Sequence, residues 1–334
     1  MRGVKMSVEL VKKSCMGGSL SFEETYSAFI DMMDGKLEEA EIAGVLISMR
    51  LRGETVDEIA GAARAMNEKK ISFDTDVQVY DTCGTGGSGK STMNVSSAVA
   101  VLLSAMGYPV VKHGNRAVSG VVGSADIFEM SGVPVNSEKS DMQSYFGKHN
   151  FAFLFAPMYH PALKYAGAVR RKLRVPTIFN FLGPLANPAN VGGQIVGMAM
   201  RDKLAVLAES LLMLGRDRVA VYSSLDGYDE ISSFAPTEVH EVSGGRIIKH
   251  YINPAEYFTP FQMPVVKTNE DADFFFNKAI SADGGDYSKL IALNAGLALT
   301  VFGKTDSIRD GYRLALETIK TGIVVEKLAS LRGN

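Results

Sequence analysis

The sequence predicts an α/β protein in two parts: a small all-helical N-terminal domain, and a larger domain with a mostly parallel central sheet flanked by helices. The first observation is that residues 1–74 show only helical patterns. The second is that from Val77 onward short apolar runs alternate with helix-length segments, as in parallel strands joined by crossover helices. We therefore expect a helical domain over residues 1–74, completed by helices near residues 163–190, and an α/β domain over residues 75–334.

Two helix starts in the N-terminal part carry the same capping signal. Ser21 and Thr55 are each followed three residues later by a glutamate, Glu24 and Glu58. This capping box satisfies free N–H groups at a helix start, and apolar residues at helical spacing follow both boxes. Another helix is expected over residues 37–51, ending at the glycine just beyond it.

The larger domain is expected to contain six strands, each a short apolar run. These are Val77–Tyr80, Pro109–Lys112, Phe151–Ala156, Thr177–Phe181, Gln194–Ala199 and Arg218–Tyr222. Between the first two, the apolar run from Val95 to Met106 predicts a helix. The last part of the chain, over Leu290–Phe302 and Ser307–Lys320, returns to amphipathic helix.

Composition limits the classes of partner. With 334 residues, 46% hydrophobic and 22% charged, the chain can bury a large core and form two domains. A net charge of −2 without a Lys/Arg-rich run argues against nucleic acid. Only Cys15 and Cys83 are present, which favours a reducing cytoplasm. The N-terminus lacks a signal-peptide pattern, and polar residues and a proline interrupt the longest apolar stretch, so no membrane association is expected.

A glycine-rich loop precedes the helix that begins near Val95. Gly84–Ser91 fits the nucleotide-binding expression G-x-x-x-x-G-K-[ST], and its glycines let backbone N–H groups approach a phosphate closely. A P-loop enzyme also needs an apolar strand that ends in an aspartate for Mg²⁺. The two candidates do not qualify, because Val77–Asp81 runs into the loop itself and serines interrupt Val219–Asp226. Phosphate binding is therefore expected, and an ATP- or GTP-binding module is the weaker alternative.

Two further polar segments follow strand candidates, where ligands sit in a parallel sheet. Lys112–Ser119 offers cationic, amide and hydroxyl donors, and Gly123–Asp126 opens a helix after it. Asp226–Glu230 is an acidic glycine turn, which suits Mg²⁺ because that ion prefers one or two carboxylates plus substrate phosphates and water. Two phosphate loops and one acidic turn predict a Mg²⁺-bound substrate with several phosphates.

Five motifs, in order and spacing, resemble those of the anthranilate phosphoribosyltransferase family. They are Gly84-Thr85-Gly86-Gly87 with Asn94-Val95-Ser96, Lys112-His113-Gly114-Asn115-Arg116, Gly123-Ser124-Ala125-Asp126, Asn180-Phe181-Leu182-Gly183-Pro184-Leu185-Ala186-Asn187-Pro188, and Asp229-Glu230. The resemblance implies a nucleoside phosphorylase/phosphoribosyltransferase-like fold. It implies transfer of the 5-phosphoribosyl group from phosphoribosyl pyrophosphate (PRPP) to anthranilate, with Mg²⁺, in tryptophan biosynthesis. It also implies a homodimer joined through the helical domain.

The resemblance also implies the site residues. For PRPP they are Gly84, Gly87, Ser88, Thr92, Asn94, Val95, Ser96, Ser97, Lys112, His113, Gly114, Asn115, Arg116, Ala117, Val118, Ser119, Gly120 and Ser124. For anthranilate they are Gly84, Asn115 and Arg170, and for the metal they are Ser96, Asp229 and Glu230. A guanidinium suits the planar carboxylate of anthranilate, and the neighbouring Arg171 is the rival for this contact.

The implied chemistry needs no protein nucleophile. Breaking the bond between C1 and pyrophosphate leaves oxocarbenium character on the ribose and negative charge on the leaving group, so Mg²⁺ and N–H donors around the pyrophosphate are the main requirement. The aromatic amine is neutral at pH 7 and attacks once it is held in line. We therefore assign positioning to Asn115 and Arg170 and no proton transfer to any histidine.

The chain departs from the family pattern in the glycine loop and in the second loop. Ser88 stands where the family usually has aspartate, and Lys90 and Ser91 replace residues that are usually small or uncharged. Val121 and Val122 stand where the family usually shows Lys-Ser. The first loop thereby loses an anion and gains a cation, which predicts an altered Mg²⁺ affinity or PRPP geometry. The alternatives are a paralogue with another aromatic acceptor and a nucleoside phosphorylase.

Overall fold

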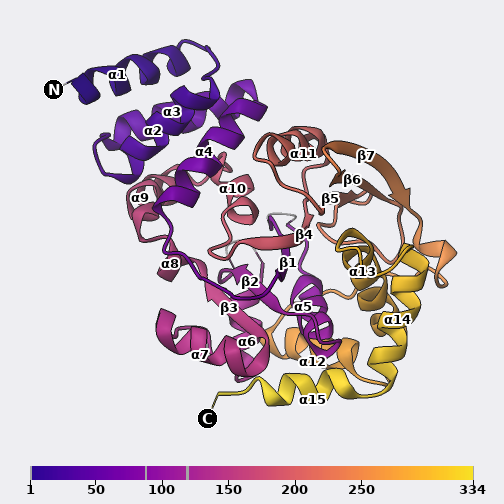
Figure 1. The fold of residues 1–334 in the computed structure, drawn as a ribbon. Coiled ribbons are helices and arrows are strands. Elements are labelled where there is room, and N and C mark those ends of the chain that lie inside the picture. Colours follow the sequence, from indigo (N-terminus) through magenta and orange to yellow (C-terminus); the bar gives the residue numbers. More distant parts are fainter. Residues whose placement is uncertain (1, 87–88, 118–119, 334) are drawn as a thin grey trace.

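A small helical lobe is joined to a larger α/β lobe in the computed structural model, which describes residues 2–86, 89–117 and 120–333 (Figure 1). The N-terminal lobe begins with α1 (Arg2–Cys15), α2 (Phe22–Met33), α3 (Glu39–Arg52) and α4 (Val56–Lys69). Both predicted capping boxes are confirmed, because Ser21 Oγ and Thr55 Oγ1 accept from the N–H groups of Glu24 and Glu58 while those carboxylates accept from the cap N–H groups. The glycine after α3, Gly53, has a positive φ of 91° and ends that helix.

The larger lobe is built on a seven-stranded sheet with strand order β3-β2-β1-β4-β5-β6-β7. The strands are β1 (Val79–Gly84), β2 (Val110–Gly114), β3 (Phe151–Phe155), β4 (Val191–Gly197), β5 (Val219–Ser224), β6 (Thr237–Ser243) and β7 (Arg246–Ile252). The five strands β1 to β5 are parallel, and β6 and β7 add an antiparallel edge, which confirms the predicted fold class. From β1 the chain proceeds to β2 and β3 on one side and then returns to β4 on the other, so the topological switch point lies between β1 and β4.

Helices cover both faces of this sheet. They are α5 (Val95–Ala105), α6 (Ser124–Met130), α7 (Lys139–His149), α8 (Ala156–Tyr159), α9 (Lys164–Leu173), α10 (Phe179–Leu185), α11 (Leu204–Met213), α12 (Asn269–Ile280), α13 (Asp286–Val301), α14 (Ile308–Lys320) and α15 (Ile323–Ser330). Short 3-10 turns occupy Pro161–Leu163, Arg201–Lys203 and Pro254–Glu256. The helix α9 packs on α2 and α3, and α10 packs on α4, so both lie between the N-terminal helices and the sheet (Figure 1).

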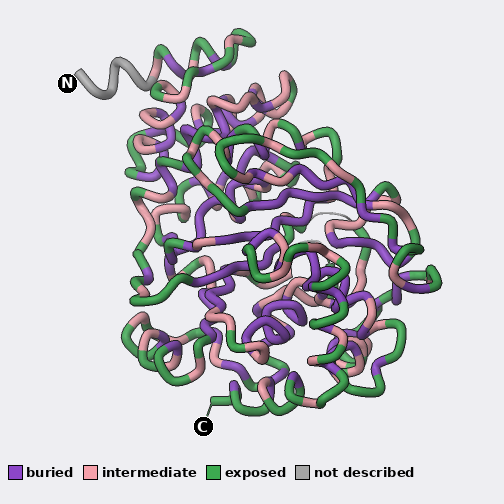
Figure 2. Tube along the Cα trace, turned by 45° about the vertical axis from the view of Figure 1, so that its right-hand side comes forward, coloured by how far each residue is buried: buried purple, intermediate pink, exposed green. Residues whose placement is uncertain are grey.

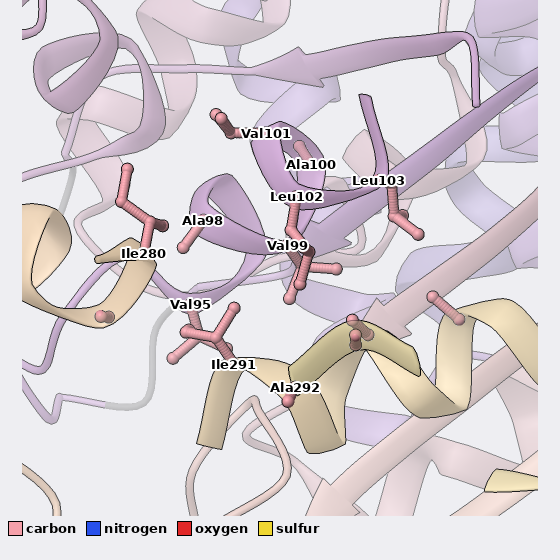
Figure 3. Close-up of a cluster of buried hydrophobic side chains, with 14 of the residues drawn as sticks. Val95, Ala98, Val99, Ala100, Val101, Leu102, Leu103, Ile280, Ile291 and Ala292 are labelled. Atoms are coloured by element: carbon pink, nitrogen blue, oxygen red, sulfur yellow. The ribbon is translucent and has the colours of Figure 1, made fainter. Parts of the chain in front are cut away.

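The main core lies on the face of the sheet covered by α5 and by the C-terminal helices. Figure 3 shows Val95 and Val99 of α5 beside Ile291 and Ala292 of α13, all of them buried. The strands β1 to β6 run through the middle of the molecule and are mostly buried, whereas β7 at the sheet edge is mostly exposed or half-buried (Figure 2). In the described ranges, no helix combines the length and apolar character that crossing a bilayer requires.

Two sequence interpretations of the sheet were wrong or incomplete. Thr177–Phe181, predicted as a strand, is instead a turn at Thr177 and Ile178 followed by the first residues of α10. Because α10 is short and buried on most sides, its apolar run resembles a buried strand. The hairpin of β6 and β7 was missed, although Gly244 and Gly245 between two runs of β-forming residues are a hairpin signal; both glycines have positive φ, 56° and 73°.

Candidate functional site

The carboxyl ends of β1 and β4 meet at the switch point, and the acidic turn lies directly on them. Gly84 and Gly197 are register partners at these strand ends. A Cβ on Gly84 would come 2.8 Å from Asp229 Oδ2, and a Cβ on Gly197 would overlap the backbone oxygen of Asp229. The N–H of Gly86 donates to Asp229 Oδ2 at 3.1 Å. Only glycine fits at these two positions, because the acidic turn approaches both strand ends closely. Asp229 is thereby in direct contact with the glycine loop.

The acidic turn concentrates negative charge in a partly buried place. Glu230 is buried, and its pKa is raised well above the ordinary value by burial first, then by the neighbouring carboxylates Asp229 and Asp226. Its Oε1 has no hydrogen-bond partner among the described residues. Asp226 is held by the hydroxyls of Ser224 and Ser232, the latter at 2.7 Å. Buried, mutually repelling carboxylates with an unused oxygen fit a cation.

In the described part of the chain, no three or more His, Cys, Asp or Glu side chains are arranged to hold a metal ion without other ligands. This fits the expected ion, because Mg²⁺ in phosphate-transfer sites is held by one or two carboxylates while substrate phosphates and water complete its coordination. The assignment of Asp229 and Glu230 as ligands of a substrate-bound Mg²⁺ stays a prediction.

The N-terminus of α5 and a buried lysine form the floor next to the glycine loop. The ammonium of Lys112 on β2 is buried and donates to the backbone oxygen of Thr82 and, at 3.2 Å, to Ser96 Oγ. Burial lowers the pKa of Lys112, and Asp81 opposes that effect. Three polar atoms around the start of α5 are buried without a partner among the described residues: Thr92 Oγ1, Asn94 Oδ1 and Ser97 Oγ. Buried polar groups are normally paired, so three unpaired atoms close together in the sequence make the start of α5 a candidate ligand site.

The second loop is held in shape by α6. The backbone oxygen of Asn115 accepts from the N–H of Ala125 at 3.1 Å and from Ser124 Oγ at 3.3 Å. The carboxylate of Asp126 accepts from the N–H groups of Ala117 and Gly123, both at 2.9 Å. The loop therefore returns onto the first turn of α6, and at its start the side-chain oxygen of Asn115 accepts from the N–H of Arg116 at 2.8 Å.

Arg116 does not point its charge at the glycine loop. Its guanidinium donates to Asp126 Oδ1 at 2.9 Å and to Glu129 Oε2 at 2.7 Å. These carboxylates raise the pKa of Arg116. The positive charge of Arg116 is thus balanced by two carboxylates of α6, a pairing that the sequence alone did not reveal. The predicted residues Gly87, Ser88, Val118 and Ser119 lie outside the described residues.

A buried polar cluster beneath the site was missed by the sequence reasoning. Asp81 on β1 is fully buried and accepts from Asn187 Nδ2 and Gln194 Nε2, both at 2.9 Å. Burial raises the pKa of Asp81, and the charge of Lys112 lowers it. The signal available in the sequence was an aspartate at the end of an apolar run. This cluster ties β1, β4 and the segment after α10 together, directly below Lys112.

Two histidines extend the site toward the helical lobe. The rings of His113 and His160 lie 5.1 Å apart, and His160 Nε2 lies 2.9 Å from the backbone oxygen of Ala186. Burial lowers the pKa of His113 to about 3 and that of His160 to about 4. Both imidazoles are therefore neutral at pH 7.

Of the two rival arginines on α9, Arg170 is the more enclosed. Burial lowers the pKa of Arg170, and its guanidinium lies 5.1 Å from the ring centroid of Phe179. Arg171 is exposed. No hydrogen bond among the described residues joins Arg170 to Asn115 or Gly84.

The segment that fits the nucleotide-binding expression is described except for residues 87 and 88, and it does not lead into a helix as a P-loop does. In a P-loop the helix follows the lysine directly, whereas here α5 begins at Val95, beyond Ser91. The ammonium of Lys90 donates instead to the backbone oxygen of Asp226. The glycine loop therefore differs from that of the nucleotide-binding module that was the weaker alternative.

The comparison with known families identifies the class. Residues 76–325 match "Glycosyl transferase family, a/b domain", and residues 8–70 match "Glycosyl transferase family, helical bundle domain". Together with the phosphate-type loops at the switch point, these matches define a glycosyltransferase with a helical bundle and an α/β domain.

Individual relatives narrow this class. The chain is 39% identical over 333 residues to an anthranilate phosphoribosyltransferase of Priestia megaterium, covering 98% of this chain and 97% of the relative. The structure of the enzyme of that name from Thermus thermophilus matches with a TM-score of 0.88 at 34% identity, over 97% of this chain and 99% of that one. The Saccharomyces cerevisiae enzyme in complex with PRPP and Mg shares the fold at 21% identity, with a TM-score of 0.86 over 98% and 96% of the two chains. The chain belongs to the anthranilate phosphoribosyltransferase family, as its motifs predicted.

Proposed function

We propose that this protein transfers the 5-phosphoribosyl group of PRPP to the amine of anthranilate, giving N-(5-phosphoribosyl)anthranilate and pyrophosphate, in tryptophan biosynthesis. The observation that carries the proposal is the acidic turn seated on the glycine loop at the switch point, through Asp229, Gly84 and Gly86, in a chain with full-length similarity to this family. A paralogue with another acceptor or a nucleoside phosphorylase would share the fold, so the choice of acceptor distinguishes them.

PRPP would lie between the glycine loop, the start of α5 and the second loop. Support comes from the unpartnered atoms of Thr92, Asn94 and Ser97 and from the buried ammonium of Lys112 beside Ser96. The ammonium and the N–H groups of the glycine loop would stabilise charge that develops on the leaving pyrophosphate, because fixed donors in a water-poor site need no reorganisation. The full proposed set is the one given above from the family pattern.

Asp229, Glu230 and Ser96 would hold Mg²⁺ together with PRPP. The fit rests on the unpartnered, buried carboxylate oxygen of Glu230 beside Asp229. When bound, Mg²⁺ supplies positive charge that makes pyrophosphate a better leaving group. The backbone of Gly86 orients Asp229 for this role, and Lys112 orients the hydroxyl of Ser96.

Anthranilate would be positioned by Asn115 and Arg170, with its neutral amine in line with C1 of the ribose. Support comes from the half-buried guanidinium on the ring of Phe179 and from the neutral pair His113 and His160, which adds no competing charge. In-line positioning is the main requirement, since the amine needs no deprotonation before it attacks.

The first test is ligand-dependent stability. PRPP with Mg²⁺ at about 100 times its dissociation constant is expected to stabilise the folded state by about 2.7 kcal/mol, which a thermal shift assay resolves. ATP with Mg²⁺ is the matched control and is expected to shift the melting temperature little, because the loop lacks P-loop geometry. Equal stabilisation by ATP would contradict the phosphoribosyltransferase assignment.

Arg170→Ala is expected to raise the KM for anthranilate strongly and the KM for PRPP little. Loss of a partly buried partner for a carboxylate costs about 2–5 kcal/mol, so kcat/KM for anthranilate should fall at least about 30-fold. Arg170→Lys should recover only part of this, because an ammonium lacks the planar two-point contact. Steady-state kinetics with each substrate varied provide the measurement.

Arg171→Ala is the control for that experiment, since Arg171 is exposed on the same helix. It is expected to be mild. An anthranilate defect in Arg171→Ala with a silent Arg170→Ala would show that the family pattern was placed one residue off. Two silent variants would favour a paralogue whose acceptor has no carboxylate.

The assembly and the domain boundaries belong to the same proposal. We assign residues 1–74 to the helical domain, with α9 and α10 completing it, and residues 75–334 to the α/β domain. The packing of α9 on α2 and α3 supports the inclusion of α9 in the helical domain. We also propose a homodimer through the helical domain, in the cytoplasm. Exposed apolar side chains on the helical domain favour the dimer, since Met16 is 88% exposed and Leu51 is 82% exposed. Light scattering on the purified protein should give twice the chain mass, and a monomeric mass would exclude the dimer.

A further inference from the structure

Lys90 connects the glycine loop to the acidic turn through its side chain. Its ammonium donates to the backbone oxygen of Asp226 and lies 4.2 Å from the ring centroid of Tyr228. Between these two contacts, a Cβ on Gly227 would come within 3.9 Å of Lys90 Nζ. The ammonium of Lys90 therefore lies against the acidic turn, although Lys90 belongs to the glycine loop and is an exposed residue.

The ammonium shares this turn with the carboxylates proposed for the metal. Asp226, Asp229 and Glu230 lie within the same five residues, and Gly86 of the glycine loop already donates to Asp229. The ammonium of Lys90 is held on the backbone of this same turn, so its positive charge shares the turn with the carboxylates and with any cation that they bind.

We propose that Lys90 is an internal counter-ion of the acidic turn, which weakens metal binding to the free protein so that Mg²⁺ binds well only together with PRPP. This inference rests on the proposed function, because it assigns a role to the same site. Like charges on one turn repel weakly in water and more strongly in a partly enclosed site, so an ammonium held on the backbone of Asp226 should weaken cation binding several-fold. The phosphates of PRPP bring negative charge that offsets this repulsion.

The test is Mn²⁺ binding without PRPP, measured by electron paramagnetic resonance. Lys90→Met removes the charge and keeps an unbranched apolar side chain, and it should bind Mn²⁺ about 5–10-fold more tightly than the natural protein. Because the effect is electrostatic, the difference should shrink as ionic strength rises. A role in loop shape alone would not show that salt dependence.

Lys304→Met is the matched control. Lys304 also places an ammonium on tyrosine rings, 5.1 Å from the centroid of Tyr80 and 5.5 Å from that of Tyr108, but it has no contact with the acidic turn among the described residues. This variant should bind Mn²⁺ like the natural protein. Lys90→Gln, which removes the charge with a different side chain, should behave like Lys90→Met, and thermal melting confirms that each variant is folded.

The outcomes separate this inference from the function on which it rests. Unchanged Mn²⁺ affinity in both Lys90 variants overturns the counter-ion role, as does equal tightening in Lys304→Met or an absence of Mn²⁺ binding in every variant. If PRPP with Mg²⁺ still stabilises the natural protein, the proposed function stands in each of these cases. If it does not, the proposed function fails, whatever the Lys90 variants show.

Discussion

Asp229→Ala and Glu230→Ala should each lower kcat by about 10²–10³-fold while the protein remains folded. Asp229 is joined to the glycine loop by the N–H of Gly86, so its removal takes away a proposed metal ligand and also releases that loop. Glu230 is buried, and its Oε1 has no partner among the described residues, so its loss removes a proposed metal ligand without breaking a hydrogen bond of that oxygen. The measurement is steady-state turnover at several Mg²⁺ concentrations, accompanied by thermal melting.

The dependence on Mg²⁺ is the informative part of this result. Raising the Mg²⁺ concentration should recover part of the activity if one carboxylate remains, because the other still binds the ion. Asp283→Ala is the control: this carboxylate is 80% exposed and pairs with Lys278 away from the turn, so turnover should not change. If both acidic-turn variants keep near-natural activity at limiting Mg²⁺, the metal assignment is wrong.

Gly197→Ala should destabilise the protein and inactivate it together. The added methyl would overlap the backbone oxygen of Asp229, and a backbone atom cannot move aside as the end of a flexible side chain can. Overpacking a close-packed site costs about 1–3 kcal/mol and sometimes more, so we expect a cost at the upper end and a displaced acidic turn. Differential scanning calorimetry and PRPP binding by titration calorimetry measure the two effects.

Alanine substitutions at two other glycines give the comparison for Gly197→Ala. At Gly84 the obstacle is the carboxylate of Asp229, 2.8 Å from the added Cβ, so Gly84→Ala should disturb the site more than the stability. Gly147 on α7 has nothing within 4 Å of an added Cβ, and Gly147→Ala should be neutral or stabilising because alanine favours a helix. A fully active and stable Gly197→Ala would show that the turn does not rest on β4.

The sequence determined the features that are encoded locally. Capping boxes at Ser21 and Thr55 set two helix starts, and the alternation of apolar runs with helices set the parallel sheet. It also predicted that loops suited to phosphate follow β1 and β2, since glycines and hydrogen-bond donors next to a strand end carry that signal by themselves. Where local signals were ambiguous, as in the short buried run that forms α10, the prediction was wrong because packing on α4 decides between helix and strand.

The tertiary structure alone decided which of these pieces touch. Strand order places β1 beside β4, and only that register brings Asp229 onto Gly84 and Gly197. The same long-range packing turns Arg116 toward Asp126 and Glu129 and away from the glycine loop. It also directs Lys90 to the acidic turn. No local pattern contains this information, because a contact between segments far apart in the chain depends on how the whole sheet is ordered and on which charges its loops bring together.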